Sequence, residues 1–286
     1  MRIRLGVTLT LFSTLAHGAP LMVLNAPGGK TTCGTSIASN GLVAGVVSSG
    51  QATSERGFLF QNGVFIYPGV NLASGSVFFS GVNRYGTITG STLYSASISV
   101  GNFLVRNGVT SMPTVSLGPV QTLTGISDSG ALLGTVGRPP SNQFPFGTFA
   151  AGFQLARNGA TTLIDDGSGS ASPLAQDETG QQIVGTSFSH AWIYSGGKFT
   201  TLNDPVAGAF TFPHGVDAQG RISGSYYVST APNVVAAHGF LLRGGTYRTW
   251  DVPGAIWTQI LGANGRGQIT GCFKDTHGIH GFVATP

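Results

Sequence analysis

The chain has 286 residues, of which 41% are hydrophobic and only 8% are charged, and its formal net charge is +4. A nucleic-acid-binding protein usually gathers its cations to neutralise phosphates, whereas the 14 Lys and Arg residues here are scattered. Composition therefore argues against nucleic acid as a partner, and the length allows one or two domains.

Residues 1–18 have the features of a secretory signal peptide. Arg2 and Arg4 give a positive start, an apolar run covers Leu5–Leu15, and small residues precede a cleavage site after Gly18. The apolar run is shorter than the roughly 20 residues that span a membrane, and no later stretch is long and apolar enough. We expect a secreted or periplasmic protein. The alternative is that this segment forms a buried first strand.

A glycine pattern recurs six times along residues 19–286. Each copy has an apolar residue, then Asx or Ser, and then two glycines, as in VNRYGTITG and VDAQGRISG. The copies end at Gly45, Gly90, Gly134, Gly185, Gly224 and Gly271. A period of about 45 residues predicts a repeat architecture, and therefore a single domain over residues 19–286.

Two further segments belong to the repeat. One is an aromatic-centred segment such as HGFLLRGG, and the other is TWDVPGA, which precedes the next glycine pattern. Asn25–Gly45 aligns without a gap on Asp251–Gly271, so the chain starts with the end of one unit and finishes in the middle of another. We expect strand Leu21–Asn25 to complete the last unit and close a ring.

Each unit is expected to contain four short strands rich in β-branched and aromatic residues. In the fifth unit these are about Phe210–Asp217, Arg221–Val228, His238–Leu242 and Thr246–Asp251. Asn-Gly or Gly-Gly pairs suit tight hairpins at 62–63, 107–108, 158–159, 196–197 and 244–245. The sequence predicts an all-β fold, a six-bladed β-propeller closed by the N-terminal strand, with a β-solenoid as the alternative.

The combination of H-G-F-L, D-V-P-G-A and the glycine pattern resembles the HAF-type repeats of bacterial extracellular proteins. His190, His238 and His280 match the histidine of that repeat, whereas Arg56 and two other residues, Gly101 and Ala151, replace it. The resemblance implies a secreted β-repeat protein without a shared activity, so no common histidine chemistry is expected.

Cys33 and Cys272 are the two cysteines of the chain. They fall in the first and last units, which are neighbours only if the ring closes. Export would permit a disulfide between them. In the chain-entropy model, a bond that closes so long a loop raises the free energy of unfolding by up to roughly 5 kcal/mol. Two buried free thiols are the alternative.

Three arginines occupy the same hairpin position in different units and are candidate ligand-binding residues. Arg106, Arg157 and Arg243 would line one rim of a ring and could bind an anionic or carboxylate-bearing glycan. Asp165 and Asp166 lie in a loop that breaks the period and could bind a ligand or cation. Ordinary solvation of turns is the alternative for both sets.

No catalytic constellation stands out. The segment D-T-H-G-I-H, from Asp275 to His280, has a metal-like spacing but too few ligands, so we expect no metal and no cofactor. Asp128, Asp177 and Asp217 fall in repeat turns, where Asx side chains cap their own backbone. We expect a monomeric, non-catalytic binding module for a glycan or an envelope protein. The alternative is an extracellular hydrolase or lyase that acts on a polysaccharide.

Overall fold

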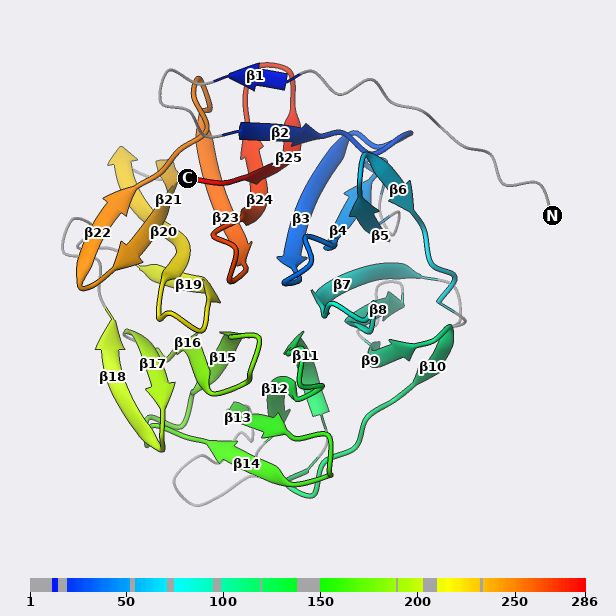
Figure 1. Ribbon diagram of the computed structural model, residues 1–286, viewed down its shortest axis with the longest axis vertical. Coiled ribbons are helices and arrows are strands. Elements are labelled where there is room, and N and C mark those ends of the chain that lie inside the picture. Colours follow the sequence, from blue (N-terminus) through cyan, green and yellow to red (C-terminus); the bar gives the residue numbers. More distant parts are fainter. Residues whose placement is uncertain are drawn as a thin grey trace.

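The computed structural model describes residues 12–14, 20–51, 55–70, 75–94, 99–118, 120–137, 150–188, 190–202, 210–231 and 234–286. The regular elements in these ranges are β-strands, arranged as blades around a central axis (Figure 1). The chain is an all-β propeller. Its described part contains no helix that could cross a membrane.

Six strands surround the axis and contact their neighbours in turn (Figure 1). They are β3 (Thr31–Ile37), β7 (Ser76–Val82), β11 (Val120–Ile126), β15 (Ser172–Gln176), β19 (Thr211–Val216) and β23 (Trp257–Ala263). Each pairs antiparallel with a second strand: β4 (Val43–Ser48), β8 (Ile88–Tyr94), β12 (Leu132–Gly137), β16 (Gln182–Thr186), β20 (Ile222–Ala231) and β24 (Ile269–Lys274).

Third and fourth strands extend the sheets outward. The third strands are β5 (Arg56–Gln61), β9 (Ser99–Arg106), β13 (Ala150–Leu155), β17 (Ala191–Ser195), β21 (Val234–Arg243) and β25 (Ile279–Ala284). The fourth strands are β6 (Val64–Ile66), β10 (Val109–Ser111), β14 (Thr161–Ile164), β18 (Lys198–Leu202), β22 (Thr246–Thr249) and β2 (Pro20–Leu24). The four strands expected in the fifth unit are confirmed as β19 to β22, with β20 and β21 longer than expected.

The expectation of six separate four-stranded sheets needs a correction. Four such sheets are present, and the strands of the first and last units join in one nine-stranded sheet. The junction is a single parallel pair, Thr31 of β3 with Ile279 of β25. It forms because β2 runs along β25 and the chain then turns directly into β3.

The N-terminal strand closes the ring, as the sequence predicts. Leu21 pairs with Ala284 and Leu24 with Gly281, so β2 is the antiparallel outer neighbour of β25. A short strand β1 (Phe12–Thr14) pairs in turn with β2. Cys33 on β3 and Cys272 on β24 form a disulfide with 4.8 Å between their Cα atoms. This confirms the bonded alternative and links the two units where the ring closes.

Each unit is built around an aromatic ring on its third strand that covers a glycine on its second strand. All six rings are fully buried, and each is the cross-strand partner of its glycine. A Cβ at Gly45 would meet the Phe58 ring at 2.2 Å. The other pairs are Gly90–Phe103, Gly134–Phe153, Gly185–Trp192, Gly224–Phe240 and Gly271–Phe282. The second glycine of the sequence pattern is therefore required by close packing.

Four of the five expected tight hairpins have the backbone that they require. Positive φ angles occur at both central residues of 62–63, 107–108, 196–197 and 244–245. At 158–159 only Gly159 has a positive φ, and the Ala156 amide bonds to the Ala160 carbonyl across a longer loop. The segment 137–148, whose three prolines lengthen the third unit of the sequence, lies, apart from Gly137, outside the described residues.

Removing the disulfide is expected to destabilise the ring. The bond joins residues separated by 239 positions, and the chain-entropy model assigns such a loop up to about 5 kcal/mol of unfolding free energy. We expect a Cys33→Ala/Cys272→Ala variant to unfold at a lower urea concentration by tryptophan fluorescence. A reductant should shift the wild-type midpoint and leave that of the variant unchanged. Equal midpoints for oxidised and reduced wild type would contradict this role.

Candidate functional site

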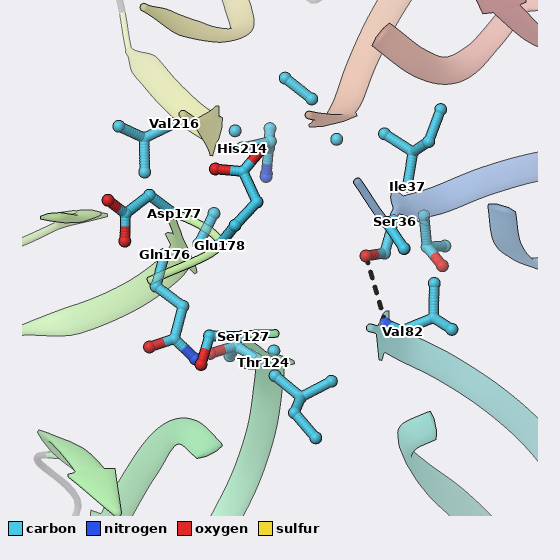
Figure 2. A pocket seen from close by; sticks show the side chains of 18 of the residues that line it. Ser36, Ile37, Val82, Thr124, Ser127, Gln176, Asp177, Glu178, His214 and Val216 are labelled. Atoms are coloured by element: carbon cyan, nitrogen blue, oxygen red, sulfur yellow. Dashed lines mark hydrogen bonds between the residues drawn. The ribbon is translucent and has the colours of Figure 1, made fainter. Parts of the chain in front are cut away.

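A cavity of about 60 Å³ lies on the propeller axis (Figure 2). Every inner strand has a β-bulge opposite its second strand, and the extra residue lines this cavity. These residues are Thr35, Ser80, Thr124, Leu174, His214 and Leu261. The cavity has room for a few water-sized molecules.

His214 is the titratable member of this set. Burial lowers its pKa to about 4, so the imidazole is neutral at pH 7. It stacks on Phe212, with 6.2 Å between the ring centroids. Within the described residues its ring nitrogens have no hydrogen-bond partner, and the Thr124 hydroxyl beside the same cavity has none either. Both groups are therefore available to a molecule in the cavity.

Asp128 spans the turns at one end of the cavity. Its carboxylate accepts hydrogen bonds from the Ser39 hydroxyl at 2.5 Å and from the Arg84 amide at 2.8 Å. The expectation that Asp128 caps its own turn is wrong, because Ser127 occupies that position and accepts a bond from the Ala131 amide. Asp128 instead joins the turns of the first three units.

Glu178 has the equivalent role on the opposite side. Its carboxylate accepts hydrogen bonds from the amides of Gly265 and Ala218, and its carbonyl accepts one from the Asp128 amide at 2.9 Å. Glu178 and His214 both line the cavity (Figure 2). The carboxylates of Asp128 and Glu178 are therefore used to hold this end of the ring together.

The turns between first and second strands form a continuous hydrogen-bonded circle. Asp177 and Asp217 cap their own turns as expected, and Asn83 and Asn264 do the same. Neighbouring turns are joined by Asn264 to the Ala38 carbonyl, Asn40 to the Arg84 carbonyl, Asn83 to the Ser127 carbonyl, the Asp128 amide to the Glu178 carbonyl, the Ala218 amide to Glu178, and Arg221 to the Gly265 carbonyl.

The repeat histidines make structural contacts. His238 Nδ1 lies 2.8 Å from Asp251 Oδ2, and Asp251 also accepts a bond from the Gly239 amide. In the last unit His280 Nδ1 lies 2.6 Å from Asn25 Oδ1, so this pair joins the two ends of the chain. In both units, the histidine on the third strand is thus held by an Asp or Asn that follows the fourth strand.

The segment from Asp275 to His280 folds as a turn. The His277 and Gly278 amides donate to Asp275 Oδ1, and His280 Nε2 lies 3.3 Å from the same atom. The His277 amide is the main cause of the lowered pKa of Asp275. The described residues contain no group of three or more His, Cys, Asp or Glu side chains arranged to hold a metal.

Asp165 and Asp166 are also engaged by their own loop. Asp165 accepts a bond from the Gly167 amide, and Asp166 accepts bonds from Ser168 and from the Ser187 hydroxyl. Burial would raise the pKa of Asp166, but these hydrogen bonds and the nearby His190 lower it overall. The loop accounts for both carboxylates without a ligand.

The three predicted arginines lie in separate sheets. Arg106 ends β9, Arg157 follows β13 and packs beside Gly130, and Arg243 ends β21. The structure brings none of them together, so they do not form one site. Arg243, however, lines a different pocket.

This pocket is a groove of about 420 Å³ between the β19–β22 sheet and the β23–β25 strands, and we call it the arginine groove. Arg221, Arg243, Arg248 and Arg266 line it, and Asp217 is the one acidic side chain among the described residues that do so. Asp217 Oδ2 accepts a bond from Arg221 Nε at 2.5 Å. In the described chain the other three guanidinium groups form no ion pair. The groove therefore has an excess of positive charge.

Sequence reasoning missed most of this groove. Arg221 and Arg266 lie in the repeat turns of adjacent units, and Arg248 lies on a fourth strand. Strand pairing within one unit brings Arg221 and Arg248 near Arg243, and Arg266 is added by the packing of the next unit. An alignment of the units would have shown one signal, namely that Arg221 and Arg266 lie near the same turn in two consecutive units.

Neutral His214 should make the protein sensitive to acid. The unfolded chain binds a proton near pH 6.5 and the folded protein near pH 4. This stabilisation is therefore complete above about pH 6.5 and is lost as the pH falls towards 4, by about 3 kcal/mol. We expect His214→Gln to lose less stability than wild type between pH 7 and 4.5 in urea titrations. The exposed His277→Gln is the control and should behave as wild type; equal acid sensitivity in His214→Gln would contradict this assignment.

No family model and no curated protein matches the chain. Solved structures do resemble it. A gluconolactonase from Xanthomonas campestris has a TM-score of 0.53 and 12% identity, covering 98% of this chain and 96% of its own. A putative TolB from Agrobacterium tumefaciens has a TM-score of 0.55 and 13% identity, covering 81% and 87%.

A third similar structure is a catalytically inactive virginiamycin B lyase from Staphylococcus aureus with quinupristin. Its TM-score is 0.51 at 12% identity, and the match covers 95% of this chain and 93% of that one. Two of the three proteins are thus named as enzymes. At such low identity the likeness establishes the propeller fold alone.

Proposed function

We propose that this chain is an exported, non-catalytic binding module that holds an anionic ligand in the arginine groove. The observation that carries the proposal is the convergence of four arginines on one groove with a single acidic side chain. Guanidinium groups bind carboxylates and phosphates through paired hydrogen bonds. Three of these four guanidinium groups form no ion pair within the described chain, so their like charges repel one another unless an anionic ligand binds.

Binding is favoured over catalysis because the acidic side chains beside the axial cavity are hydrogen-bonded within the turns. Asp128, Asp177 and Glu178 line the axial cavity, and their carboxylates accept hydrogen bonds that cap or join turns. A hydrolase needs a carboxyl pair that is free to exchange protons with a substrate. The rival function, a polysaccharide hydrolase or lyase, is tested with the same ligands by looking for turnover.

Export to the periplasm or the exterior is part of the proposal. It is supported by the leader-like residues 1–18 and by the Cys33–Cys272 disulfide, because such bonds persist in oxidising compartments. Cleavage after Gly18 would remove β1 and keep the pairing of β2 with β25. We also propose that the units are HAF-type repeats and that the nine-stranded sheet acts as two blades joined at one residue pair. Six repeat units then surround the axis of a monomer.

Binding can be tested with purified residues 19–286 and a panel of anions: polygalacturonate, heparin, poly-glutamate and duplex DNA. We expect Arg243→Gln/Arg248→Gln to weaken binding of the best ligand about tenfold or more in calorimetry, since a charge-assisted hydrogen bond is worth about 1.5–3 kcal/mol. Arg106→Gln/Arg157→Gln removes the same charge from other sheets and should bind as wild type. Equal weakening in both variants would mean non-specific attraction, and product release would favour the enzyme.

Export can be tested by expressing the full chain in a bacterial host. We expect the protein in the periplasm or medium to begin at Ala19 by N-terminal sequencing, since the cleavage site follows Gly18. Arg2→Glu/Arg4→Glu should retain the precursor in the cytoplasm. An intact Met1 on the exported protein would contradict cleavage.

A further inference from the structure

The ligand class of the arginine groove is constrained by its walls. Buried Ile269 and half-buried Leu241 and Ala263 pack in one cluster and give the groove an apolar floor. Ile222 and Leu242 also lie along the groove, but their side chains belong to the cluster on the other face of the β19–β22 sheet. Arg243, Arg248 and Arg266 are exposed, so the groove is open to solvent along their side. A ligand in it has one face against apolar surface and the other face in water.

Hydrogen-bonding capacity in the groove is unbalanced. Each guanidinium group offers several donors and no acceptor. The neutral amides of Asn264 and Gln268 are already bonded in their own turn, and the Asp217 carboxylate holds Arg221 and the turn amides. The hydroxyls of Ser223, Thr246 and Thr285 also line the groove and can accept a bond, but the four guanidinium groups make donors the larger part of its polar lining. This suits a ligand that presents oxygen atoms.

These properties separate the candidate ligands. No aromatic side chain lines the groove among the described residues, so nucleic-acid bases have no stacking surface. An alkyl carboxylate would leave half of its chain in water. A bound peptide would bring an amide N–H group with almost every residue, and the arginines cannot accept a hydrogen bond from any of them. A sugar ring with a carboxylate can place its C–H face on the floor, its carboxylate on arginine and its hydroxyls in water.

We infer, building on the proposed function, that the arginine groove binds a uronic-acid oligosaccharide, with one carboxylate on Arg221. Arg221 is the guanidinium whose position is fixed. Its Nε donates to Asp217, and its Nη2 donates to the Gly265 carbonyl at 3.0 Å. Arg243, Arg248 and Arg266 then take the carboxylates of adjoining sugar units. Asp217 is a positioning residue, because it orients Arg221 without contacting the ligand.

The first experiment measures binding of galacturonic acid, its dimer and trimer, and the fully methyl-esterified trimer by calorimetry. We expect the trimer to bind at least tenfold more tightly than the monomer, because it can reach several arginines. The ester keeps the sugar and removes the charge, so it should bind about tenfold or more weakly than the acid. Decanoate and poly-glutamate are the rival ligands, and both should bind more weakly than the trimer.

The second experiment examines Asp217. The turns capped by Asn83 and Asn264 show that Asn is tolerated at this position, so Asp217→Asn should fold. We expect it to weaken trimer binding severalfold, and Arg221→Lys to do the same although the charge is kept. Asp177→Asn is the control, because it changes the equivalent turn of another unit, in which the carboxylate holds no arginine. This variant should bind the trimer as tightly as wild type does. Unchanged binding in Asp217→Asn and Arg221→Lys would overturn the role of Arg221.

The outcomes distinguish this inference from the proposed function. If the ester binds as well as the acid, or if decanoate or poly-glutamate binds more tightly, the ligand class is wrong while anion binding stands. If no anion binds wild type, the proposed function fails with it.

Discussion

The pairing of β2 with β25 is the constraint on which the rest of the ring depends. Without it, the last sheet would end at β25 and leave an open edge, which invites association with other chains. The disulfide and the His280–Asn25 contact lie in the same region and also join residues from the two ends of the chain. Three different kinds of contact thus keep the first and last units together, and both the axial cavity and the turn circle need that arrangement.

A second consequence of closure concerns the arginine groove. One of its walls belongs to the β23–β25 strands, whose outer neighbour is β2. The other wall belongs to the β19–β22 sheet. The candidate site therefore lies next to the unit that is assembled from both ends of the chain, and its shape depends on correct closure.

Much of the fold could be predicted because the same contacts recur. The second glycine of each pattern is needed beneath an aromatic ring, and the Asx residues cap turns, so both leave a periodic signal. The split unit also left a signal, since Asn25–Gly45 aligns on Asp251–Gly271. The union of the first and last units in one sheet was not predictable, because it depends on a single residue pair, Thr31 with Ile279.

The candidate site was harder to predict, since it combines side chains from different strands of one unit with Arg266 from the next. Arg106, Arg157 and Arg243 share a repeat position, yet equivalent positions lie on different sheets. Arg221 lies near Arg243 because β20 pairs with β21 in the same unit, whereas Arg266 reaches the groove because the next unit packs beside them. Asp128 was assigned to its own turn, but its carboxylate reaches two other units. A repeated sequence pattern identifies the contacts that every unit makes. It does not show which non-equivalent positions of the repeat come into contact.

The bulges of the inner strands have a broader consequence. Each strand contributes one side chain to the axis, and those six positions carry Thr, Ser, Thr, Leu, His and Leu. Since the backbone distortion is common to all six, a substitution at one position would alter the chemistry of the channel without disturbing the other five. The lining of the axial cavity in this chain can therefore change one residue at a time on an unchanged backbone.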